Sequence, residues 1–241
     1  MAKGKADDLI APILFAIFAF VSSKIINILK KDLHGLQQSP SPSDFYPSRI
    51  PSSLNTTITE NFLQDGTNLQ SLQNKAVWQD CLDTKGGWID KGAPNSNVWE
   101  ELAHKIWMPE TEYYGLAVGF EYWCHILTPG KELPWHIDKD EFEYSENGNL
   151  VYPIMGSVYY GFDHTFEGGY LETIDADIEQ HPIHYINTRP NEIVRTEAKF
   201  NRKILFNATL WHHVSEVFSG ERFVLAVNAW SIRPQKFNHR D

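Results

Sequence analysis

The sequence is short of basic residues. Lys and Arg total 21 against 31 Asp and Glu in a chain of 241 residues, which gives a formal net charge of −10 at pH 7. An acidic surface repels phosphate backbones, and no cluster of basic residues offsets that repulsion. We therefore expect no nucleic-acid partner.

Cysteine is also scarce, with Cys81 and Cys124 the only two in the chain. Two cysteines exclude both a disulfide framework and a four-thiolate zinc site. Free cysteines behave as small buried hydrophobic residues, so we expect two reduced, partly buried thiols. On this interpretation, cysteine usage does not identify the redox compartment.

Long apolar runs are missing. The longest apolar stretch is Leu9 to Val21, which is too short to span a bilayer as a helix, and an extension to Leu29 brings Lys24 and Asn27 into the span. Residues 1–31 carry five Lys and two Asp, a charge of +3 that leaves −13 for the remainder. This segment fits either a signal or membrane anchor acting through residues 9–29, or a helix packed on the domain. A cytoplasmic location and a membrane-anchored or secretory one therefore stay equally open.

The remaining chain divides by composition. Residues 37–53 are rich in Ser and Pro and indicate a linker. Residues 54–111 predict a helical support region, with one or two helices before Gly86-Gly87 and another helix over 98–107. After that, segments rich in β-branched and aromatic residues predict strands at 113–127, 151–162, 170–174, 203–209 and 222–232. We therefore expect a fold that is mainly β with flanking helices, in which residues 112–235 form a sandwich or barrel.

A metal-binding pattern lies within the predicted strands. His136 and Asp138 are two residues apart, a spacing that places both side chains on one face of a strand. Downstream, the pair His212-His213 follows an apolar strand, and Arg222 begins the next one. Two His and one carboxylate leave open positions on an octahedral iron(II), and a guanidinium can grip a carboxylate through two parallel hydrogen bonds. The competing interpretation of His212-His213 is a turn with one packed and one solvated histidine.

Three segments in order carry a family resemblance: Pro134-Trp135-His136-Ile137-Asp138, then Phe166-Glu167-Gly168-Gly169-Tyr170-Leu171, then His212-x-Val214 with Arg222 ten residues after His212. Together they resemble the iron(II)- and 2-oxoglutarate-dependent oxygenases, in particular the prolyl 4-hydroxylase-like branch. The resemblance covers roughly residues 112–232. It implies a double-stranded β-helix, a jelly-roll or cupin-like barrel, with helices packed on one side.

The resemblance also assigns roles to individual residues. It implies that His136, Asp138 and His212 bind Fe(II) and that Arg222 holds the far carboxylate of 2-oxoglutarate. His212 is preferred to His213 because the family ligand precedes x-Val and lies ten residues before the basic residue. Further contacts to the co-substrate are expected from Tyr160, which is the better match, and from Tyr159 and Thr128; ordinary strand or turn packing is the alternative for all three. O2 completes the reaction, and ascorbate is an optional reductant in such enzymes.

The implied activity is a dioxygenase that hydroxylates a prolyl or other amino-acid side chain in a peptide or protein. The alternatives are the same chemistry on a free small molecule and a catalytically silent jelly-roll binding protein. Zinc-dependent hydrolysis is disfavoured because no H-E-x-x-H motif is present. Neither the substrate nor the oligomeric state follows from these residues.

Other polar segments receive simpler interpretations. We expect His164, His181 and His184 to be solvated loop histidines and the acidic stretch 138–143 to be a solvated hairpin. Two glycosylation sequons start at Asn55 and Asn207. The second falls in the strand predicted over 203–209, where a glycan would not fit, and this mildly disfavours a glycosylating compartment.

Overall fold

The structure is a computed structural model that describes residues 56–64, 66–176 and 183–238. The predicted N-terminal segment 1–31, the linker 37–53, Asn55 and His181 lie outside these residues. Among the described residues, no helix combines the length and the apolar character that a membrane crossing requires.

Two antiparallel sheets form the body of the described chain. The larger sheet has the spatial order β1 (Thr56–Thr59), β9 (Arg202–Phe206), β5 (Met155–Tyr160), β12 (Arg222–Trp230), β3 (Gly119–Leu127) and β2 (Gly87–Asp90). The smaller sheet has the order β4 (Leu133–His136), β10 (Trp211–Val214), β7 (Leu171–Ile174) and β8 (Val194–Thr196). A short ladder pairs β6 (Glu167–Gly168) with β11 (Val217–Ser219).

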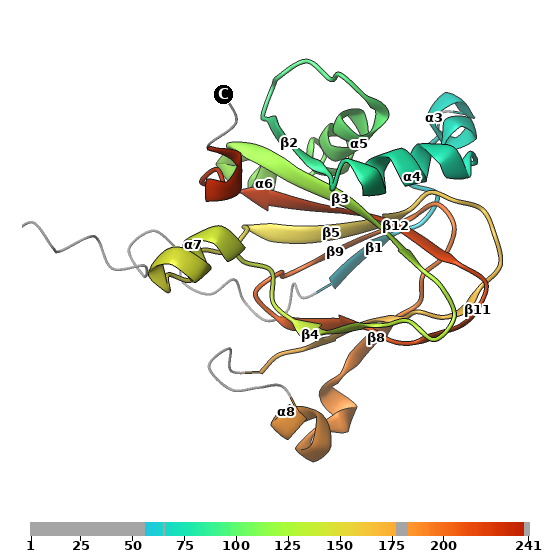
Figure 1. Ribbon diagram of the computed structural model, residues 1–241, viewed down its shortest axis with the longest axis vertical. Coiled ribbons are helices and arrows are strands. Elements are labelled where there is room, and N and C mark those ends of the chain that lie inside the picture. The colour runs from blue at the N-terminus through green and yellow to red at the C-terminus, as the bar shows by residue number, and fades with distance from the viewer. Residues whose placement is uncertain (1–55, 65, 177–182, 239–241) are drawn as a thin grey trace, which may run out of the picture. The chain divides into compact units, whose positions relative to one another are not determined.

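The path of the chain between the two sheets defines the fold. In sequence order, β3, β5, β9 and β12 belong to the larger sheet and β4, β7, β8 and β10 to the smaller one. The chain thus crosses repeatedly from one sheet to the other, and the sheets face each other as two walls (Figure 1). This is the strand order of a double-stranded β-helix, so the predicted fold class is confirmed. Apolar side chains that include Val158, Ile204 and Val224 fill the space between the walls.

Helices cover the outer face of the larger sheet (Figure 1). They are α3 (Gly66–Ser71), α4 (Lys75–Asp83), α5 (Val98–Trp107) and α6 (Thr111–Leu116). The bounds of α5 match those of the predicted helix. The helix begins after Asn97 because the side-chain oxygen of that residue accepts hydrogen bonds from the backbone N–H groups of Trp99 and Glu100. Its apolar face buries Leu102 and Ile106 completely. The helical layer is thereby fixed against β3.

Two parts of the secondary-structure prediction are wrong. The region 54–111 contains β1 and β2, which are edge strands of four residues each and too short to show a clear alternation. Conversely, the strand predicted from Tyr113 begins only at Gly119, because Thr111–Leu116 forms α6. Tyr113 packs edge-on against Trp107 of α5, with 6.4 Å between ring centroids, and this tertiary contact accompanies the helical conformation.

The acidic stretch after Asp138 is also not a hairpin. Residues Glu141–Asn147 form the helix α7, whose first turn is capped by the Asp140 carboxylate. Gly148 ends the helix with φ of 71°, a left-handed conformation that glycine adopts without strain. The cap and the glycine together specify the helix, and Glu143 is buried rather than solvated.

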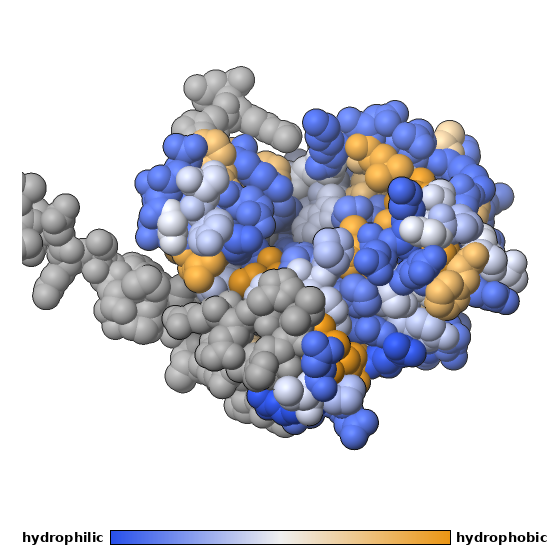
Figure 2. Space-filling model, turned by 60° about the horizontal axis from the view of Figure 1, so that its bottom comes forward, coloured by the Kyte–Doolittle hydropathy of each residue, from blue (hydrophilic) through white to orange (hydrophobic). Residues whose placement is uncertain are grey.

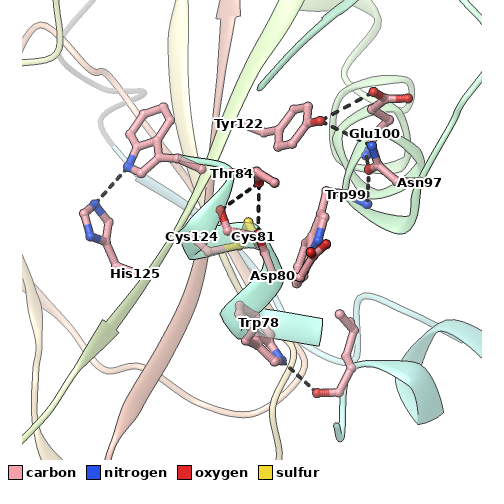
Figure 3. Close-up of a disulfide and its surroundings, with 12 residues drawn as sticks. Trp78, Asp80, Cys81, Thr84, Asn97, Trp99, Glu100, Tyr122, Cys124 and His125 are labelled. Carbon is pink, nitrogen blue, oxygen red and sulfur yellow. Dashed lines mark hydrogen bonds between the residues drawn. A yellow bond between two sulfur atoms is a disulfide. The ribbon is translucent and has the colours of Figure 1, made fainter. Parts of the chain in front are cut away.

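The two cysteines form a disulfide, so the expectation of reduced thiols is wrong. Cys81 lies on α4 and Cys124 on the outer face of β3, with a Cα–Cα distance of 5.8 Å, and both are buried (Figure 3). The pairing follows from the packing of α4 on β3, which brings together residues 43 positions apart in the sequence. The bond ties the helical layer to the barrel.

Three further helical segments lie outside this layer. The helix α8 spans Ile183–Thr188, η2 spans Pro190–Glu192 and η3 spans Gln235–Phe237.

The face drawn in Figure 2 is mostly hydrophilic, with apolar side chains in separate small groups, and it is hollowed between two lobes of the described residues.

Candidate metal centre

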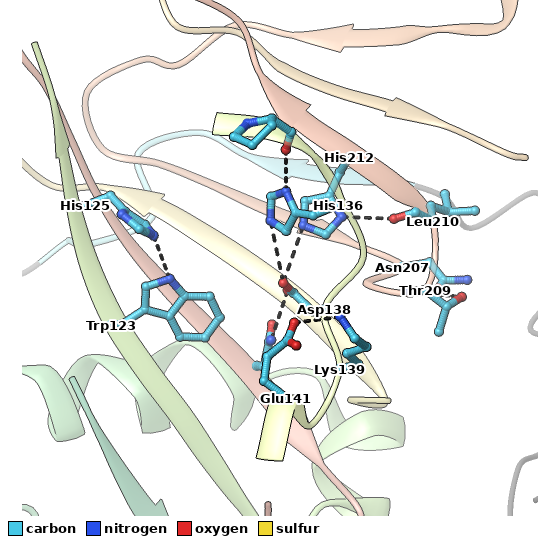
Figure 4. A network of polar contacts seen from close by, with 12 residues as sticks. Trp123, His125, His136, Asp138, Lys139, Glu141, Asn207, Thr209, Leu210 and His212 are labelled. Atoms are coloured by element: carbon cyan, nitrogen blue, oxygen red, sulfur yellow. Dashed lines mark hydrogen bonds and ion pairs between the residues drawn. The ribbon is translucent and has the colours of Figure 1, made fainter. Parts of the chain in front are cut away.

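Three side chains meet between the sheets at one end of the smaller sheet. His136 ends β4 and is the register partner of His212 on β10, while Asp138 follows β4 in the adjoining loop. An Asp138 carboxylate oxygen (Oδ1) lies 3.8 Å from His136 Nε2 and 3.6 Å from His212 Nε2. One potential ligand atom from each residue therefore lies within 4.8 Å of the others, close enough to share one metal ion (Figure 4).

Hydrogen bonds turn each of these groups toward the common centre. His136 Nδ1 donates to the carbonyl of Pro134 at 2.7 Å, and His212 Nδ1 donates to the carbonyl of Leu210 at 2.9 Å. A protonated Nδ1 leaves Nε2 with its lone pair free for a metal. Asp138 Oδ2 accepts from the side-chain amide of Asn228 at 3.0 Å, which leaves Oδ1 facing both imidazoles.

The site is closed on one side and open on the other. The His212 side chain is 5% exposed and that of Asp138 13%, whereas 41% of the His136 side chain is exposed. An approaching molecule would therefore meet the His136 edge first. Burial of this kind excludes solvent from most of the coordination sphere while leaving a route of access.

The charges of the site favour an ionised carboxylate. Burial alone would raise the pKa of Asp138, but the neighbouring His212 outweighs burial and holds that pKa below its ordinary value. Burial alone would lower the pKa of His212, and the Asp138 carboxylate raises it instead. Burial, reinforced by the charge of His212, lowers the pKa of His136. Asp138 therefore supplies the negative charge that a divalent cation requires.

Arg222 lies in the same barrel as a second polar anchor. It is 1% exposed at the start of β12, where its Nε donates to the Gly169 carbonyl at 2.8 Å and its Nη2 donates to the Tyr160 hydroxyl at 2.9 Å. Its Nη1 is buried without a hydrogen-bond partner among the described residues. A buried cationic donor left unsatisfied is costly, and a ligand carboxylate would satisfy it.

The Gly-Gly segment makes room for this arginine. A Cβ on Gly169 would lie 2.6 Å from Arg222 Cδ, and the residue has φ of 64°. A side chain at this position would displace the guanidinium. Gly169 of the Phe166–Leu171 motif is therefore needed in this chain because only glycine leaves room for the Arg222 side chain.

The structure separates the neighbouring candidates His212 and His213. The two residues alternate along β10, and the His213 ring stacks on Trp135 outside the barrel, with 4.8 Å between ring centroids. His213 Nδ1 lies 3.2 Å from a carboxylate oxygen of Glu172, a residue that does not belong to the cluster. The geometry therefore favours His212 as the ligand, as the sequence predicts.

Of the remaining predicted contacts, only Tyr160 touches Arg222. Tyr159 points to the opposite face of β5, where its hydroxyl donates to Asn201 at 3.0 Å and its ring packs edge-on against Phe62. The predicted role of Tyr159 is thus contradicted by the alternation of side chains along the strand. Thr128 is exposed in the turn after β3, and its contact with a co-substrate stays a prediction.

Three polar residues expected in solvated loops or inside a strand lie elsewhere in the structure. His164 is half-buried among Phe162, Phe166 and Phe223 instead of solvated, because the loop after β5 folds back over β12. The backbone of His184 belongs to the helix α8 and not to a loop. Asn207 lies in the turn beyond the end of β9, half-buried rather than inside a strand, and its side-chain oxygen accepts from Thr209.

Sequence reasoning missed three side chains of the barrel interior. Asn228 orients Asp138, while Trp123 and His125 lie next to each other on the inner face of β3 (Figure 4). The alternation of side chains along 119–127 and 222–230 could have identified all three as inward-facing polar groups. Alternation shows which residues of a strand share a face, but one residue known to face inward is needed to say which face that is. Arg222 is such a residue for β12, and β3 has none.

The donor set fits iron(II) with 2-oxoglutarate. Two imidazoles and one carboxylate that converge from one side leave adjacent coordination positions open, and Arg222 offers an unsatisfied donor for a carboxylate inside the same barrel. Within the described residues, no other group of His, Cys, Asp and Glu converges in this way.

Comparison with known proteins gives structural likenesses only. No protein-family model matches the chain, and no curated protein matches it. The prolyl-4-hydroxylase of Pseudomonas putida is 15% identical over 74% of this chain and 86% of that one, with a TM-score of 0.49. HygX of Streptomyces hygroscopicus, with nickel and 2-oxoglutarate bound, is 12% identical over 73% and 82%, also at 0.49.

A third likeness is the viral collagen prolyl hydroxylase vCPH of Paramecium Bursaria Chlorella virus-1 in its 2OG complex. It is 16% identical over 73% of this chain and 96% of that one, with a TM-score of 0.44. Identities and scores this low are no basis for transferring an activity. The fold assignment therefore rests on the strand order, and the chemistry of the centre rests on the residues that form it.

Proposed function

We propose that this chain is an Fe(II)- and 2-oxoglutarate-dependent dioxygenase. One observation carries the proposal: the His136–Asp138–His212 cluster and the unsatisfied Nη1 of Arg222 occur inside one barrel. In this class of reaction, 2-oxoglutarate is decarboxylated to succinate while one oxygen atom of O2 is inserted into a substrate C–H bond. The cluster offers ligands for the iron, and Arg222 offers a donor for a carboxylate of 2-oxoglutarate.

Each residue has a defined part in this proposal. His136, Asp138 and His212 hold the iron through Nε2, Oδ1 and Nε2, which their hydrogen bonds already direct inward. Arg222 binds the distal carboxylate of 2-oxoglutarate through Nη1, and the Tyr160 hydroxyl keeps the guanidinium in place. The apolar lining from β5, β9 and β12 limits the access of water to the reacting groups.

For the substrate, we propose a prolyl or other amino-acid side chain in a peptide or protein. The exposed edge of His136 supports a substrate that approaches from the surface. The same opening admits a free small molecule, which is the alternative. A silent binding protein would be expected to have lost a ligand or the basic residue, and this chain keeps both.

For the compartment, we propose a membrane-anchored or secretory location over a cytoplasmic one. Disulfides form and persist in oxidising compartments, and Cys81–Cys124 is buried in the contact between α4 and β3. Alkylation of the protein in cell extracts before and after reduction tests this. A free thiol at both positions in the unreduced sample would contradict it.

The activity is tested by succinate formation from 2-oxoglutarate in iron-loaded protein exposed to air. We expect turnover in the wild type and its loss in His136→Ala and in Arg222→Ala. The matched controls are His164→Ala and Arg195→Ala, because His164 packs on the outer-face residue Phe223 and Arg195 pairs with Glu172. Wild-type protein that binds neither iron nor 2-oxoglutarate would overturn the proposal.

The substrate is tested by coupled turnover. A set of proline-containing peptides is compared with free amino acids, and hydroxylated product is identified by a mass increase of one oxygen atom. Stimulation of succinate formation by a peptide but not by its free amino acids supports the proposed substrate class. The reverse result would favour the small-molecule alternative.

A further inference from the structure

His125 is a polar residue of the barrel interior that none of the roles above uses. On β3 it is the register partner of Val224, and two residues further along, Leu127 is the partner of Arg222. Directly paired residues of antiparallel strands share a face of the sheet, and so do residues two apart on one strand. His125 and Arg222 therefore project from the same inner face, on neighbouring strands and in adjacent rows.

Trp123 fixes the hydrogen-bonding state of His125. Its indole Nε1–H, which can only donate, lies 2.9 Å from His125 Nε2, so that nitrogen must act as the acceptor (Figure 4). The proton of the neutral ring is then on Nδ1. Trp123 is itself packed against the apolar cluster of the barrel, which limits the freedom of both rings. The pair presents a fixed N–H donor.

The charges of Arg222 and of the metal ligands both act on His125. Burial lowers its pKa, and the positive charges of Arg222 and His136 lower it further, while Asp138 opposes them. The imidazole therefore stays neutral around pH 7, and it lies within electrostatic range of both the guanidinium and the metal ligands. The hydrogen bond with Trp123 engages Nε2 and not Nδ1.

We propose that the Nδ1–H of His125 donates a hydrogen bond to a carboxylate oxygen of bound 2-oxoglutarate. His125 would thus complete the co-substrate site with Arg222, and Trp123 is the positioning residue that holds the donor in the right tautomer. The inference rests on the proposed function. 2-Oxoglutarate carries two carboxylates, and Arg222 has one unsatisfied nitrogen, so a second donor on the same inner face matches the ligand.

A purely structural role explains the arrangement less well. A residue that only fills space beside Val224 could be apolar, as the members of the barrel cluster are. His125 is half-buried, and a ligand oxygen would give its Nδ1–H an acceptor inside the barrel. The Trp123 contact satisfies only the other nitrogen.

The test measures the affinity for 2-oxoglutarate by calorimetry in Zn²⁺-loaded full-length protein, where no turnover occurs. His125→Phe should weaken binding by roughly 10- to 100-fold, as expected for the loss of a hydrogen bond to a charged group. His125→Asn, whose amide nitrogen can replace Nδ1, should restore most of the affinity. His125→Gln, whose amide nitrogen replaces Nε2 instead, should not.

Two controls distinguish a failure of the role proposed for His125 from a failure of the proposed function. Zn²⁺ affinity should be unchanged in all three His125 variants, because His125 is not a ligand. Trp123→Phe should weaken 2-oxoglutarate binding less than His125→Phe, since the donor remains but its tautomer is no longer imposed. Wild-type protein that fails to bind 2-oxoglutarate overturns the proposed function itself. Wild-type-like binding in folded His125→Phe, or equal affinities in the Asn and Gln variants, overturns only the role of His125.

Discussion

Asn228 holds Asp138 in place from the opposite sheet. Its amide nitrogen lies 3.0 Å from Asp138 Oδ2, and Asn228 itself is almost completely buried on β12, one of the two central strands of the larger sheet. Asp138, in the loop after β4, is thereby tied to the larger sheet. Partners of this kind fix the orientation of a metal-ligating carboxylate.

Asn228→Ala should weaken metal binding about 10- to 100-fold, the usual effect of losing such a partner. The carboxylate would be free to turn, and Oδ1 would no longer be held toward the two imidazoles. Titration of the metal-free protein with Zn²⁺ or Mn²⁺ measures this. Asn97→Ala, which removes the cap of α5 outside the barrel, is the control and should leave metal affinity unchanged. Equal affinities in wild type and Asn228→Ala would contradict the assigned role.

His212→Ala and His213→Ala form a matched pair on one strand. His212→Ala removes a buried ligand, so metal binding should be lost, whereas His213→Ala removes only a ring that stacks on Trp135 outside the barrel. The same metal titration distinguishes them. Loss of binding in His213→Ala with retention in His212→Ala would mean that β10 is shifted by one residue, which would exchange the faces of all its side chains.

The Cys81–Cys124 disulfide should contribute to stability through the unfolded state. The closed segment spans 43 residues, and loops of this size typically give about 2–4 kcal/mol. Cys81→Ser with Cys124→Ser should lower the free energy of unfolding by that amount in urea titrations. A reductant should lower the wild-type value similarly and leave the double variant unaffected. A wild-type protein insensitive to reductant would show that the bond does not form in solution.

Glu121 is not one of the candidate metal ligands, and its burial gives a pH-dependent prediction. Burial raises the pKa of this carboxyl, and Asp138 adds to the effect, while the Lys236 ammonium opposes it. A raised pKa means that the folded state binds the proton more tightly than the unfolded state. The wild type should therefore lose stability relative to Glu121→Gln as the pH rises from the ordinary carboxyl value of 4.5 through the folded pKa.

Urea unfolding of both proteins at several pH values checks this. Glu121→Gln should be the more stable at pH 7, and the difference should shrink toward acid. Lys236 is half-exposed and can be solvated when its partner is lost. A Gln variant less stable than wild type at neutral pH would show that the contact with Lys236 outweighs the cost of burying the charge.

The parts of the fold that the sequence predicts are those where one local pattern dominates. The strands at 119–127 and 222–230 are long and rich in β-branched and aromatic residues, and α5 has both an apolar stripe and a capping Asn97. The short edge strands β1 and β2 are stabilised by pairing with distant partners, which no local pattern records. The helix α7 is rich in acidic residues and has a weak apolar stripe, so its cap and terminal glycine were the only signals.

The candidate site likewise has residues that the sequence predicts and contacts that only the packing of distant elements creates. His136, Asp138, His212 and Arg222 follow from motif spacing, because their positions along the chain reflect a fixed strand geometry. The pairing of Cys81 with Cys124 and the contact between Asn228 and Asp138 depend on how separate elements pack. Such contacts join residues 43 and 90 positions apart and have no local signature. The prediction for Tyr159 fails because a shift of one residue along a strand moves the side chain to the other face of the sheet.

Tyr159 and Tyr160 provide a direct test of that alternation, since the same chemical change is made on the two faces of one strand. Tyr160→Phe removes the hydroxyl that accepts from Arg222 Nη2 and holds the guanidinium in place, so affinity for 2-oxoglutarate should fall by roughly tenfold. Tyr159→Phe removes a hydrogen bond to Asn201 outside the barrel. It should lower the free energy of unfolding by about 1 kcal/mol and leave co-substrate affinity unchanged. Calorimetry and urea unfolding on both variants separate the two effects. Reduced affinity for 2-oxoglutarate in Tyr159→Phe alone would mean that Tyr159, and not Tyr160, faces the barrel interior.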